Sequence, residues 1–400
     1  MSDNERLSRE LRNRADHTGG HPISFDDVKR SANKMKWQQR AATGAVAAVV
    51  LAIGIPVGMS IATGDGNSND GQVANPSPTP TETNTPSPIV TKEVTLTVDG
   101  ASRGAEPGVV YVYDNQIIQP DGTAIDVDYD YSNVAVFGEG WIGIRIDDEG
   151  NPTADVLGGD GTVIRSFPSG YTIAVSSSGE VAAFEDTPGG GTLTRYDEAG
   201  EPAQSWDFAN SVILELEGIL ADGSVVYSTE GTDPALMVAR ASGDTQPVLG
   251  ASNAGGVARE SGLITGMVSV DEMVPESCWN LFDSNGALWP KAKCAYTLGH
   301  FNESEQLIIG KPSYLDSIGD GLVAIVDVET GKALVEYDTP DDSFIANSVW
   351  EDDAHVLTLV YSPAGWHILR LDTEGNIENV NGAALPGEAE FAPVQFGAPS

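Results

Sequence analysis

Acidic residues next to a glycine are the first candidates for chemistry in this sequence. Asp372, Glu374 and Gly375 stand together in the segment RLDTEGNIENV, residues 370–380, and carboxylates and a glycine at close spacing are a feature of calcium loops. An EF-hand loop places oxygen ligands at positions 1, 3 and 5, glycine at 6 and glutamate at 12. Here the glycine follows the aspartate too soon for that pattern. The spacing therefore favours the turn of a β-hairpin over a calcium loop.

A second acidic candidate is the run DVDYDY, in which Asp126, Asp128 and Asp130 alternate with apolar and aromatic residues. In a strand this alternation places the three carboxylates on one face, where like charges in a row could attract a cation. The alternative is an outermost strand whose charged solvent face blocks pairing with other chains. We favour the outermost strand, because no turn folds the three carboxylates around a common point.

The two cysteines, Cys278 and Cys294, bracket the segment CWNLFDSNGALWPKAKC. Their midpoint is Gly286, close to the centre of a predicted turn, so the two side chains can face each other across adjacent strands. In an exported protein such a pair forms a disulfide, and we predict one here. No cysteine precedes residue 278, which excludes a Cys/His zinc site in the N-terminal part.

Support for catalysis is weak. His300, His355 and His367 lie in separate repeats of the pattern described below, and the sequence contains no Gly-x-Ser-x-Gly motif. Carboxylate pairs suited to glycoside hydrolysis remain an alternative. We predict no catalytic residue, no metal site and no cofactor. Six tryptophans are expected to pack between structural elements, with carbohydrate contact as the alternative: Trp141, Trp206, Trp279, Trp289, Trp350 and Trp366.

Charge divides the chain into two parts. Residues 1–40 carry a net charge of +3, whereas residues 41–400 carry −41. A field this negative repels phosphate backbones, so we do not expect nucleic acid as a partner of the large part.

An uncharged apolar segment, residues 41–64, separates the two parts. Its 24 residues would span about 36 Å as a helix, enough for a hydrocarbon core of about 30 Å. We predict a retained single-pass anchor, with a cleaved signal peptide as the alternative. The basic flank before it places residues 1–40 in the cytoplasm, as a basic segment with a juxtamembrane helix, and the remainder outside. Gly54 and Gly58 form a small-residue motif that could support a weak homodimer.

Proline, threonine and serine dominate residues 65–93, which show no apolar periodicity. This composition predicts a disordered, extended stalk with polyproline II character. It would hold residues 94–400 away from the bilayer.

From residue 94 onward, a glycine in a polar turn precedes a short apolar-alternating run seven times. The glycines are Gly122, Gly161, Gly200, Gly243, Gly286, Gly331 and Gly375, at intervals of 39, 39, 43, 43, 45 and 44 residues. A second turn recurs between them, near residues 179, 223, 304 and 353, and is hard to place in the first repeat and around 253–275. Two hairpins in each period of about 40–45 residues indicate a β-propeller blade of four antiparallel strands. We predict an all-β chain with about seven blades, closed by residues 391–396 or 94–98.

The runs AVSSSGEVAAF and FDSNGALW resemble the repeats of WD40-like β-propellers. The complete layout also resembles uncharacterised single-pass membrane proteins of high-GC Gram-positive bacteria. These resemblances imply a membrane-anchored propeller on the outer surface of the cell. We expect it to act as a recognition or sensor module for a protein, peptide or glycan. The alternatives are a hydrolase or lyase on the same scaffold, and a transmembrane regulator of the anti-sigma type that signals through residues 1–40.

Overall fold

The computed structural model describes residues 91–397, except for 148–149, 171, 177–178, 188–189, 198, 209–213, 230–233, 272–275, 314–318 and 390. The predicted cytoplasmic segment, membrane span and nearly all of the stalk lie outside the described residues. None of the residues that are described belongs to a helix long and apolar enough to cross a bilayer.

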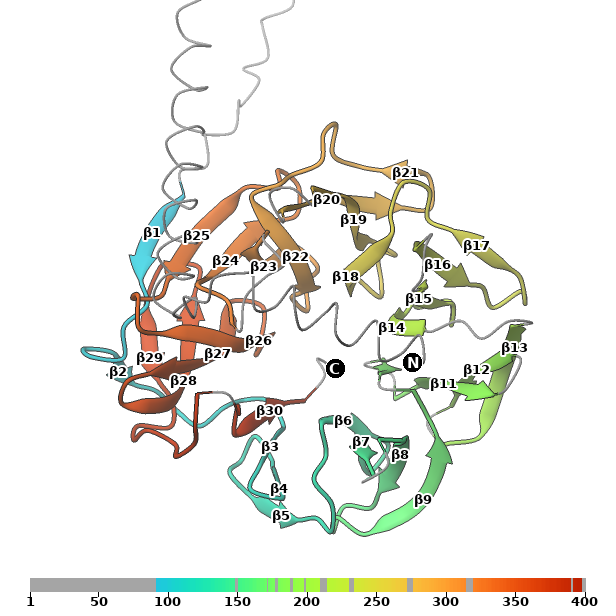
Figure 1. The fold of residues 1–400 in the computed structure, drawn as a ribbon, viewed down its shortest axis with the longest axis horizontal. Helices are drawn as coiled ribbons and strands as arrows, with labels where there is room; N and C mark the ends of the chain where they lie inside the picture. Colours follow the sequence, from blue (N-terminus) through green and yellow to red (C-terminus); the bar gives the residue numbers. More distant parts are fainter. Residues whose placement is uncertain are drawn as a thin grey trace, which may run out of the picture. The chain divides into compact units, whose positions relative to one another are not determined.

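The described strands form seven sheets arranged in a ring around a central axis (Figure 1). Each sheet contains four antiparallel strands, and two sheets carry a fifth strand that is parallel to its neighbour. The fold is therefore a seven-bladed β-propeller, which confirms the prediction from the glycine period.

The strands of blades 1 to 4 are given from the axis outward, in the order of hydrogen bonding. Blade 1 contains β30 (Val394–Phe396), β3 (Tyr111–Tyr113), β4 (Gln116–Ile118) and β5 (Ala124–Asp126). Blade 2 contains β6 (Asn133–Phe137), β7 (Gly140–Ile146), β8 (Pro152–Leu157) and β9 (Val163–Pro168). Blade 3 contains β10 (Ile173–Val175), β11 (Val181–Thr187), β12 (Gly190–Tyr196) and β13 (Pro202–Phe208). Blade 4 contains β14 (Leu214–Ile219), β15 (Val225–Thr229), β16 (Ala235–Ala239) and β17 (Thr245–Pro247).

Blades 5 to 7 follow the same order, and the last two carry the additional strands. Blade 5 contains β18 (Asn253–Val257), β19 (Ile264–Asp271), β20 (Glu276–Asp283) and β21 (Gly286–Ala287). Blade 6 contains β22 (Tyr296–Phe301), β23 (Leu307–Pro312), β24 (Leu322–Asp327), β25 (Ala333–Asp338) and the added β1 (Lys92–Thr95). Blade 7 contains β26 (Phe344–Trp350), β27 (His355–Ser362), β28 (Gly365–Asp372), β29 (Ile377–Asn379) and the added β2 (Ser102–Arg103).

The ring closes through the C-terminal strand. β30 pairs antiparallel with β3, so that Tyr111 lies opposite Phe396 and the C-terminal strand shares blade 1 with β3, β4 and β5. Residues 394–396 therefore complete the first blade, as one of the two predicted alternatives required. The other candidate segment instead begins with β1, which joins the outer edge of blade 6.

We call residues 91–104 the strap. Its strand β1 pairs with β25 of blade 6, and its strand β2 pairs with β29 of blade 7. The chain then continues towards blade 1, so that the strap follows the outer edges of two blades (Figure 1). Leu96 fixes the strap between these blades, because its side chain is only 1% exposed.

The seven predicted glycine turns all connect the third strand of a blade to the fourth. Each of these glycines has a positive φ, from 63° at Gly331 to 124° at Gly286, which is a conformation that favours glycine. The second set of turns connects the first strand of a blade to the second. In blades 2 and 5, where the sequence pattern did not locate it, this turn uses Gly138 and Gly262, both with positive φ. Blade 1 has no such turn, because its first strand, β30, comes from the C-terminal part of the described chain.

The hydrophobic core is divided into seven clusters, and each cluster fills the space between two neighbouring blades. Blades 5 and 6 approach most closely at their innermost strands. A Cβ atom on Gly255 would lie 1.8 Å from the carbonyl oxygen of Leu298, so only glycine fits there.

Candidate functional site

The segment after the strap crosses blade 7 over an arginine. Arg370, on β28, donates hydrogen bonds from Nη2 to the carbonyl oxygens of Ala105 (3.4 Å) and Glu106 (3.1 Å). The amide of Gly108 donates to the carboxylate of Glu351, which follows β26. These contacts hold residues 105–108 against the outer part of blade 7.

Arg370 is the centre of an ion-pair cluster. It contacts Glu351 through Nε and, at 2.7 Å, through Nη2, and it contacts Glu378 through Nη1 at 2.8 Å. Its side chain is 11% exposed and that of Glu351 is 7% exposed, so this pair is largely shielded from water. Hydrogen bonds to Glu351 and then to Glu378 raise the pKa of Arg370, against the effect of burial. The guanidinium stays charged and rigidly oriented.

Two adjoining grooves lie on either side of this cluster. The larger, of about 550 Å³, is lined by residues of the loop 97–102 and by the β28–β29 turn. The smaller, of about 440 Å³, is lined by residues 105–108 and by the β26–β27 turn. His355, Arg370 and Glu378 line both grooves. The walls are therefore built jointly by the strap region and by blade 7.

An aspartate orients the histidine that is shared by the grooves. Asp352 accepts hydrogen bonds from the backbone amides of Ala354 (2.8 Å) and His355 (2.9 Å). The Nδ1 atom of His355 lies 2.9 Å from the same carboxylate. Partial burial acts to raise the pKa of Asp352, but the hydrogen bonds from Ala354 and His355 outweigh it and lower that pKa. The carboxylate is thus fixed in its ionised form beside the grooves.

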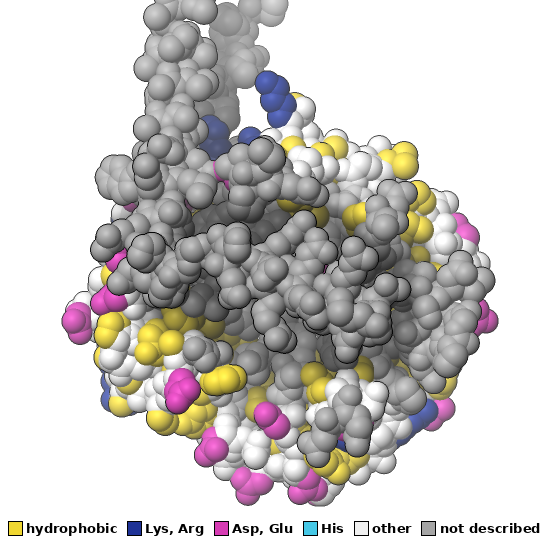
Figure 2. Space-filling model, viewed as in Figure 1, with side chains coloured by type: hydrophobic (Ala, Val, Ile, Leu, Met, Phe, Trp, Pro, Cys, Tyr) yellow, Lys and Arg dark blue, Asp and Glu magenta, His cyan; other side chains and the backbone are white. Residues whose placement is uncertain are grey.

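The grooves are acidic. Their lining includes one arginine, one histidine and six acids, namely Asp99, Glu106, Glu351, Asp352, Asp372 and Glu378. Elsewhere, on the face that Figure 2 shows, acidic side chains are scattered over the described surface instead of forming one patch. In the grooves, polar and mainly negative groups surround a hollow.

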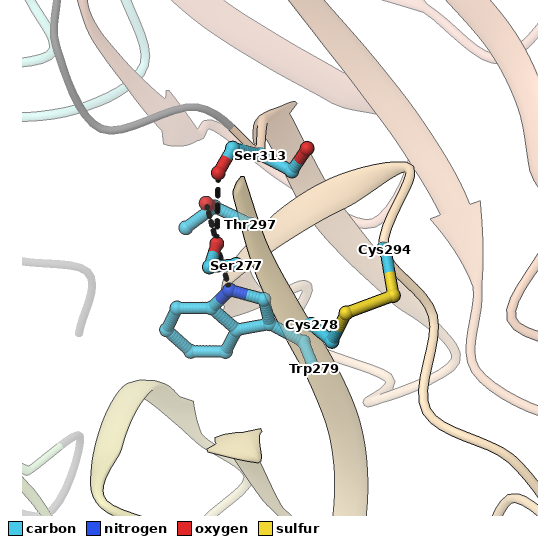
Figure 3. The surroundings of a disulfide bond; sticks show 6 residues. All are labelled: Ser277, Cys278, Trp279, Cys294, Thr297 and Ser313. Carbon is cyan, nitrogen blue, oxygen red and sulfur yellow. Dashed lines mark hydrogen bonds between the residues drawn. A yellow bond between two sulfur atoms is a disulfide. The ribbon is translucent and has the colours of Figure 1, made fainter. Parts of the chain in front are cut away.

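The predicted cysteine pair is joined. Cys278 and Cys294 form a disulfide with a Cα–Cα distance of 4.1 Å (Figure 3). The neighbouring residues Trp279 and Lys293 exchange both backbone hydrogen bonds at 2.7 Å, so the cysteines occupy the adjacent, closer position of an antiparallel pair. On the other side of the strand, the Trp279 indole donates to Ser277 at 2.8 Å, and Ser277 donates to the carbonyl of Ser313 at 3.0 Å.

The glycine turns are structural, as the spacing predicted. Asp372 accepts hydrogen bonds from the amides of Glu374 (2.8 Å) and Asn376 (2.9 Å) within its own turn. Asp121, Asp160, Asp197 and Asp283 cap their turns in the same way. Within the described residues, no group of three or more His, Cys, Asp or Glu side chains is arranged to hold a metal ion.

The prediction for DVDYDY is correct for one residue and wrong for two. Asp126 ends β5, the outermost strand of blade 1, and is exposed. Asp128 and Asp130 lie beyond that strand, so the three carboxylates do not share a strand face. The strand ends because the following residues turn towards blade 2, where Tyr131 is buried and donates to Asp155 at 3.0 Å.

The predicted tryptophans are buried, and the three histidines lie in blades 6 and 7. All six tryptophans are at most 5% exposed, which confirms packing as their role. The prediction that the three histidines lie in separate repeats is wrong for two of them: His300 lies on the innermost strand of blade 6, whereas His355 and His367 both belong to blade 7. His367 is 4% exposed, and neither ring nitrogen has a hydrogen-bond partner. Burial lowers its pKa, and the charge of Asp99 partly opposes this effect.

The sequence pattern missed the groove residues. Arg370 stands in the opening segment RLDTEGNIENV, but its partners at 105–106 are more than 260 residues away in the chain. No local spacing announces such a contact. The apolar alternation of VTLTV, residues 94–98, predicts a strand in the strap, but it does not predict which strand of the propeller that strand pairs with.

The strand order defines the chain as a seven-bladed β-propeller. No protein-family model and no curated protein matches the sequence. Among solved structures, an apocarotenoid oxygenase mutant of Synechocystis is 12% identical, with a TM-score of 0.45 over 64% of this chain and 72% of its own. The Dos1 propeller is 13% identical, with a TM-score of 0.45 over 72% and 82%. The propeller domain of a trilobed protease from Pyrococcus furiosus is 14% identical, with a TM-score of 0.43 over 63% and 84%.

Proposed function

We propose that this protein is a membrane-anchored recognition module on the outer surface of the cell, which binds its ligand in the paired grooves on blade 7. One observation carries the proposal: the strap region and blade 7 together build two polar grooves around a rigid Arg370 cluster. The predicted span at 41–64, its basic flank and the proline-rich stalk support the anchored topology. The resemblance to single-pass membrane proteins of high-GC Gram-positive bacteria points the same way.

The charge of the grooves favours a cationic ligand, and we assign a basic peptide segment. Six acids face one arginine, and that arginine already pairs with Glu351 and Glu378. Asp99 and Glu106 lie at the groove walls contributed by the strap region. Exposed charges of this kind steer and orient a partner more than they add affinity.

Binding is tested with tetralysine by isothermal titration calorimetry on the full chain in detergent micelles. The double variant Asp99→Asn, Glu106→Gln is expected to weaken binding about 2- to 30-fold, since two exposed ion pairs are lost and each contributes about 0.2–1 kcal/mol. The control variant Asp128→Asn removes an exposed charge from blade 1 and should leave binding unchanged. Unchanged binding by the double variant would contradict the assignment to the grooves, as would comparable weakening by Asp128→Asn, which would indicate a general effect of net charge.

The topology is tested separately by protease accessibility. With the chain expressed in bacteria, protease added to intact spheroplasts should remove a C-terminal tag and spare an N-terminal tag. Protection of both tags, or release of the whole chain into the medium, would contradict a retained anchor.

Transmembrane regulation is a second candidate, and one observation favours it. The strap that lines the grooves continues directly into the predicted stalk and span, so a ligand would touch the part of the propeller nearest the membrane in sequence. Deleting residues 1–30 should then abolish a cellular response while leaving tetralysine binding intact. A response that survives the deletion leaves recognition alone as the function.

Hydrolysis has less support. The turn aspartates that could have supplied catalytic carboxylates accept hydrogen bonds from their own backbone amides. These bonds lower the pKa of Asp121 and Asp283, and the hydroxyl and then the amide of Thr162 lower that of Asp160, which suits structural anions and not general acids.

A further inference from the structure

The strap is an addition to blades that are already complete. Blade 6 has four antiparallel strands from β22 to β25, and blade 7 has four from β26 to β29. The ring itself is closed by β30 in blade 1. Removal of the strap would therefore leave every blade with its four strands and the ring closed.

Beneath the strap lies the outer edge of blade 6. β1 runs parallel to β25 from the pair Lys92–Val335 to the pair Thr95–Asp338. The pairing continues one residue further, because the amide of Leu96 donates to the carbonyl of Asp338 at 2.7 Å. An edge of this kind recognises any extended segment through backbone hydrogen bonds.

Three side chains of the strap show which residues this edge of blade 6 accepts. Val94, Leu96 and Val98 alternate along the strap and pack on the cluster between blades 6 and 7. Leu96 is the anchor, since it is buried among residues such as Tyr337 and Leu369. Thr95, between the apolar residues, is exposed. The edge therefore selects apolar side chains at three alternate positions.

The strand ladders of the strap are short, although Leu96 is buried and Thr91 and Gly104 donate hydrogen bonds to the carbonyl oxygens of Ala333 and Asn379. β1 contains four residues and β2 only two. Glu93 lies directly opposite Glu336, and like charges in paired positions are destabilising. Covalent attachment compensates for these short ladders, because a tethered segment acts at an effective concentration in the millimolar range.

We propose that the outer edge of blade 6 is a strand-addition site, which the strap occupies within its own chain. When the strap leaves, the site accepts an extended peptide of a partner that carries apolar side chains at three alternate positions. The strap is then an internal competitor for a peptide-binding site that is distinct from the grooves on blade 7. This proposal does not depend on the anchored topology or on the ligand of the grooves.

The test uses the full chain and a fluorescent peptide with the sequence of residues 91–99, TKEVTLTVD. Leu96→Asp places a charge in the cluster and should displace the strap, whereas Thr95→Asp changes an exposed position of the same strand. In fluorescence anisotropy, the peptide should bind the Leu96→Asp protein at least 10-fold more tightly than the wild type or the Thr95→Asp protein. A peptide that carries aspartate in place of its leucine should not bind.

Hydrogen exchange keeps the test interpretable. In the Leu96→Asp protein, amides of β1 should lose protection, whereas amides of β23 and β24 should keep it. Loss of protection throughout blade 6 would show that the strap is integral to the blade and would overturn the proposal. A protected β1 together with no peptide binding would also overturn it, as would equally tight binding by the wild type.

Discussion

In the segment DVDYDY, residues 126–131, the hydroxyl of Tyr131 makes a buried hydrogen bond to Asp155. Asp155 is fully buried and accepts hydrogen bonds from Tyr131 (3.0 Å), Arg145 (2.7 Å) and Ser166 (2.6 Å). Burial and the charge of Asp155 raise the pKa of Tyr131, so its hydroxyl remains a donor. Gly143 leaves room for the ring, because a Cβ there would lie 2.6 Å from it. The tyrosines of DVDYDY, and not its aspartates, join blades 1 and 2.

Tyr131→Phe should lower the free energy of unfolding by about 1–3 kcal/mol, because the buried carboxylate of Asp155 loses one of its donors. Tyr129→Phe is the matched control. Tyr129 is 45% exposed, and the centroid of its ring lies 4.5 Å from the guanidinium carbon of Arg145. Phenylalanine keeps this ring contact. Chemical denaturation measures both variants, and equal losses would contradict the assigned role of the hydroxyl.

A half-buried carboxyl in blade 4 predicts a dependence of stability on pH. Glu217 lies at the bulge of β14, and burial raises its pKa to about 8 despite a hydrogen bond of 2.6 Å from Ser228. Between the ordinary pKa of glutamate and about 8, the folded chain holds a proton that the unfolded chain has released. The stability contributed by neutral Glu217 is therefore present at low pH and is lost as the pH rises through this window.

Glu217→Gln should remove this dependence, since glutamine cannot ionise. The free energy of unfolding of the variant relative to wild type should increase from pH 5 to pH 8, by about 1.4 kcal/mol for each unit by which the pKa of Glu217 is raised. Denaturation curves at pH 5, 6.5 and 8 supply the comparison. A constant difference between the two proteins would show that Glu217 has an ordinary pKa in the folded state.

At the scale of elements, local chemistry decided how much could be predicted. Each turn from a third to a fourth strand needs a residue with positive φ, and Gly122 or Gly375 reveals that need directly in the sequence. Blade number, strand number and the third-to-fourth turns were therefore predictable. The second turn could not be placed in blade 1, because the first strand of that blade is β30, from the C-terminal part of the chain, and no turn joins it to β3.

The strap and the grooves belong to what could not be predicted. The alternation of Val94 and Leu96 predicts a strand, but a strand of four residues can pair with the outer edge of any blade. Its choice of blade 6 depends on Leu96 meeting a cluster assembled from residues 309 to 371. The position of Arg370 beneath residues 105–106 follows from that choice. The pairing of the strap with blade 6 and the position of Arg370 both depend on the assembled ring, which local sequence patterns do not predict.

The disulfide compensates for a short edge strand. β21 contains two residues, so the outer part of blade 5 has few ladder hydrogen bonds. The bond between Cys278 and Cys294 closes a loop with a sequence separation of 16 and holds residues 288–294 beside β20. Replacing both cysteines with serine should cost about 2–4 kcal/mol of the free energy of unfolding. Reducing agent should lower the stability of the wild type to that of the variant and leave the variant unchanged, and an additional loss in the variant would contradict this explanation.

At the scale of the whole molecule, two joints of different kinds meet near blade 1. β30 is the innermost strand of that blade, and Val394 is fully buried in the cluster shared with blade 7. The strap adds a second connection, from the outer edges of blades 6 and 7 to the start of β3. The first joint completes a blade, whereas the second only covers edges. A substitution that disrupts the first joint should therefore destabilise more of the ring than a substitution that disrupts the second.

Val394→Asp should destabilise the whole ring by at least about 3 kcal/mol, because it places a charge in a closed apolar cluster and loosens the strand that joins blades 7 and 1. Protection from hydrogen exchange should fall in blades 1 and 7 together. Gln395→Glu changes the neighbouring, half-buried position of β30 and should leave both protection and stability nearly unchanged. Leu96→Asp should confine its effect to the strap and the adjacent edges. If Leu96→Asp instead reduced protection around the entire ring, the strap would be part of the closure, and the distinction between the two joints would be wrong.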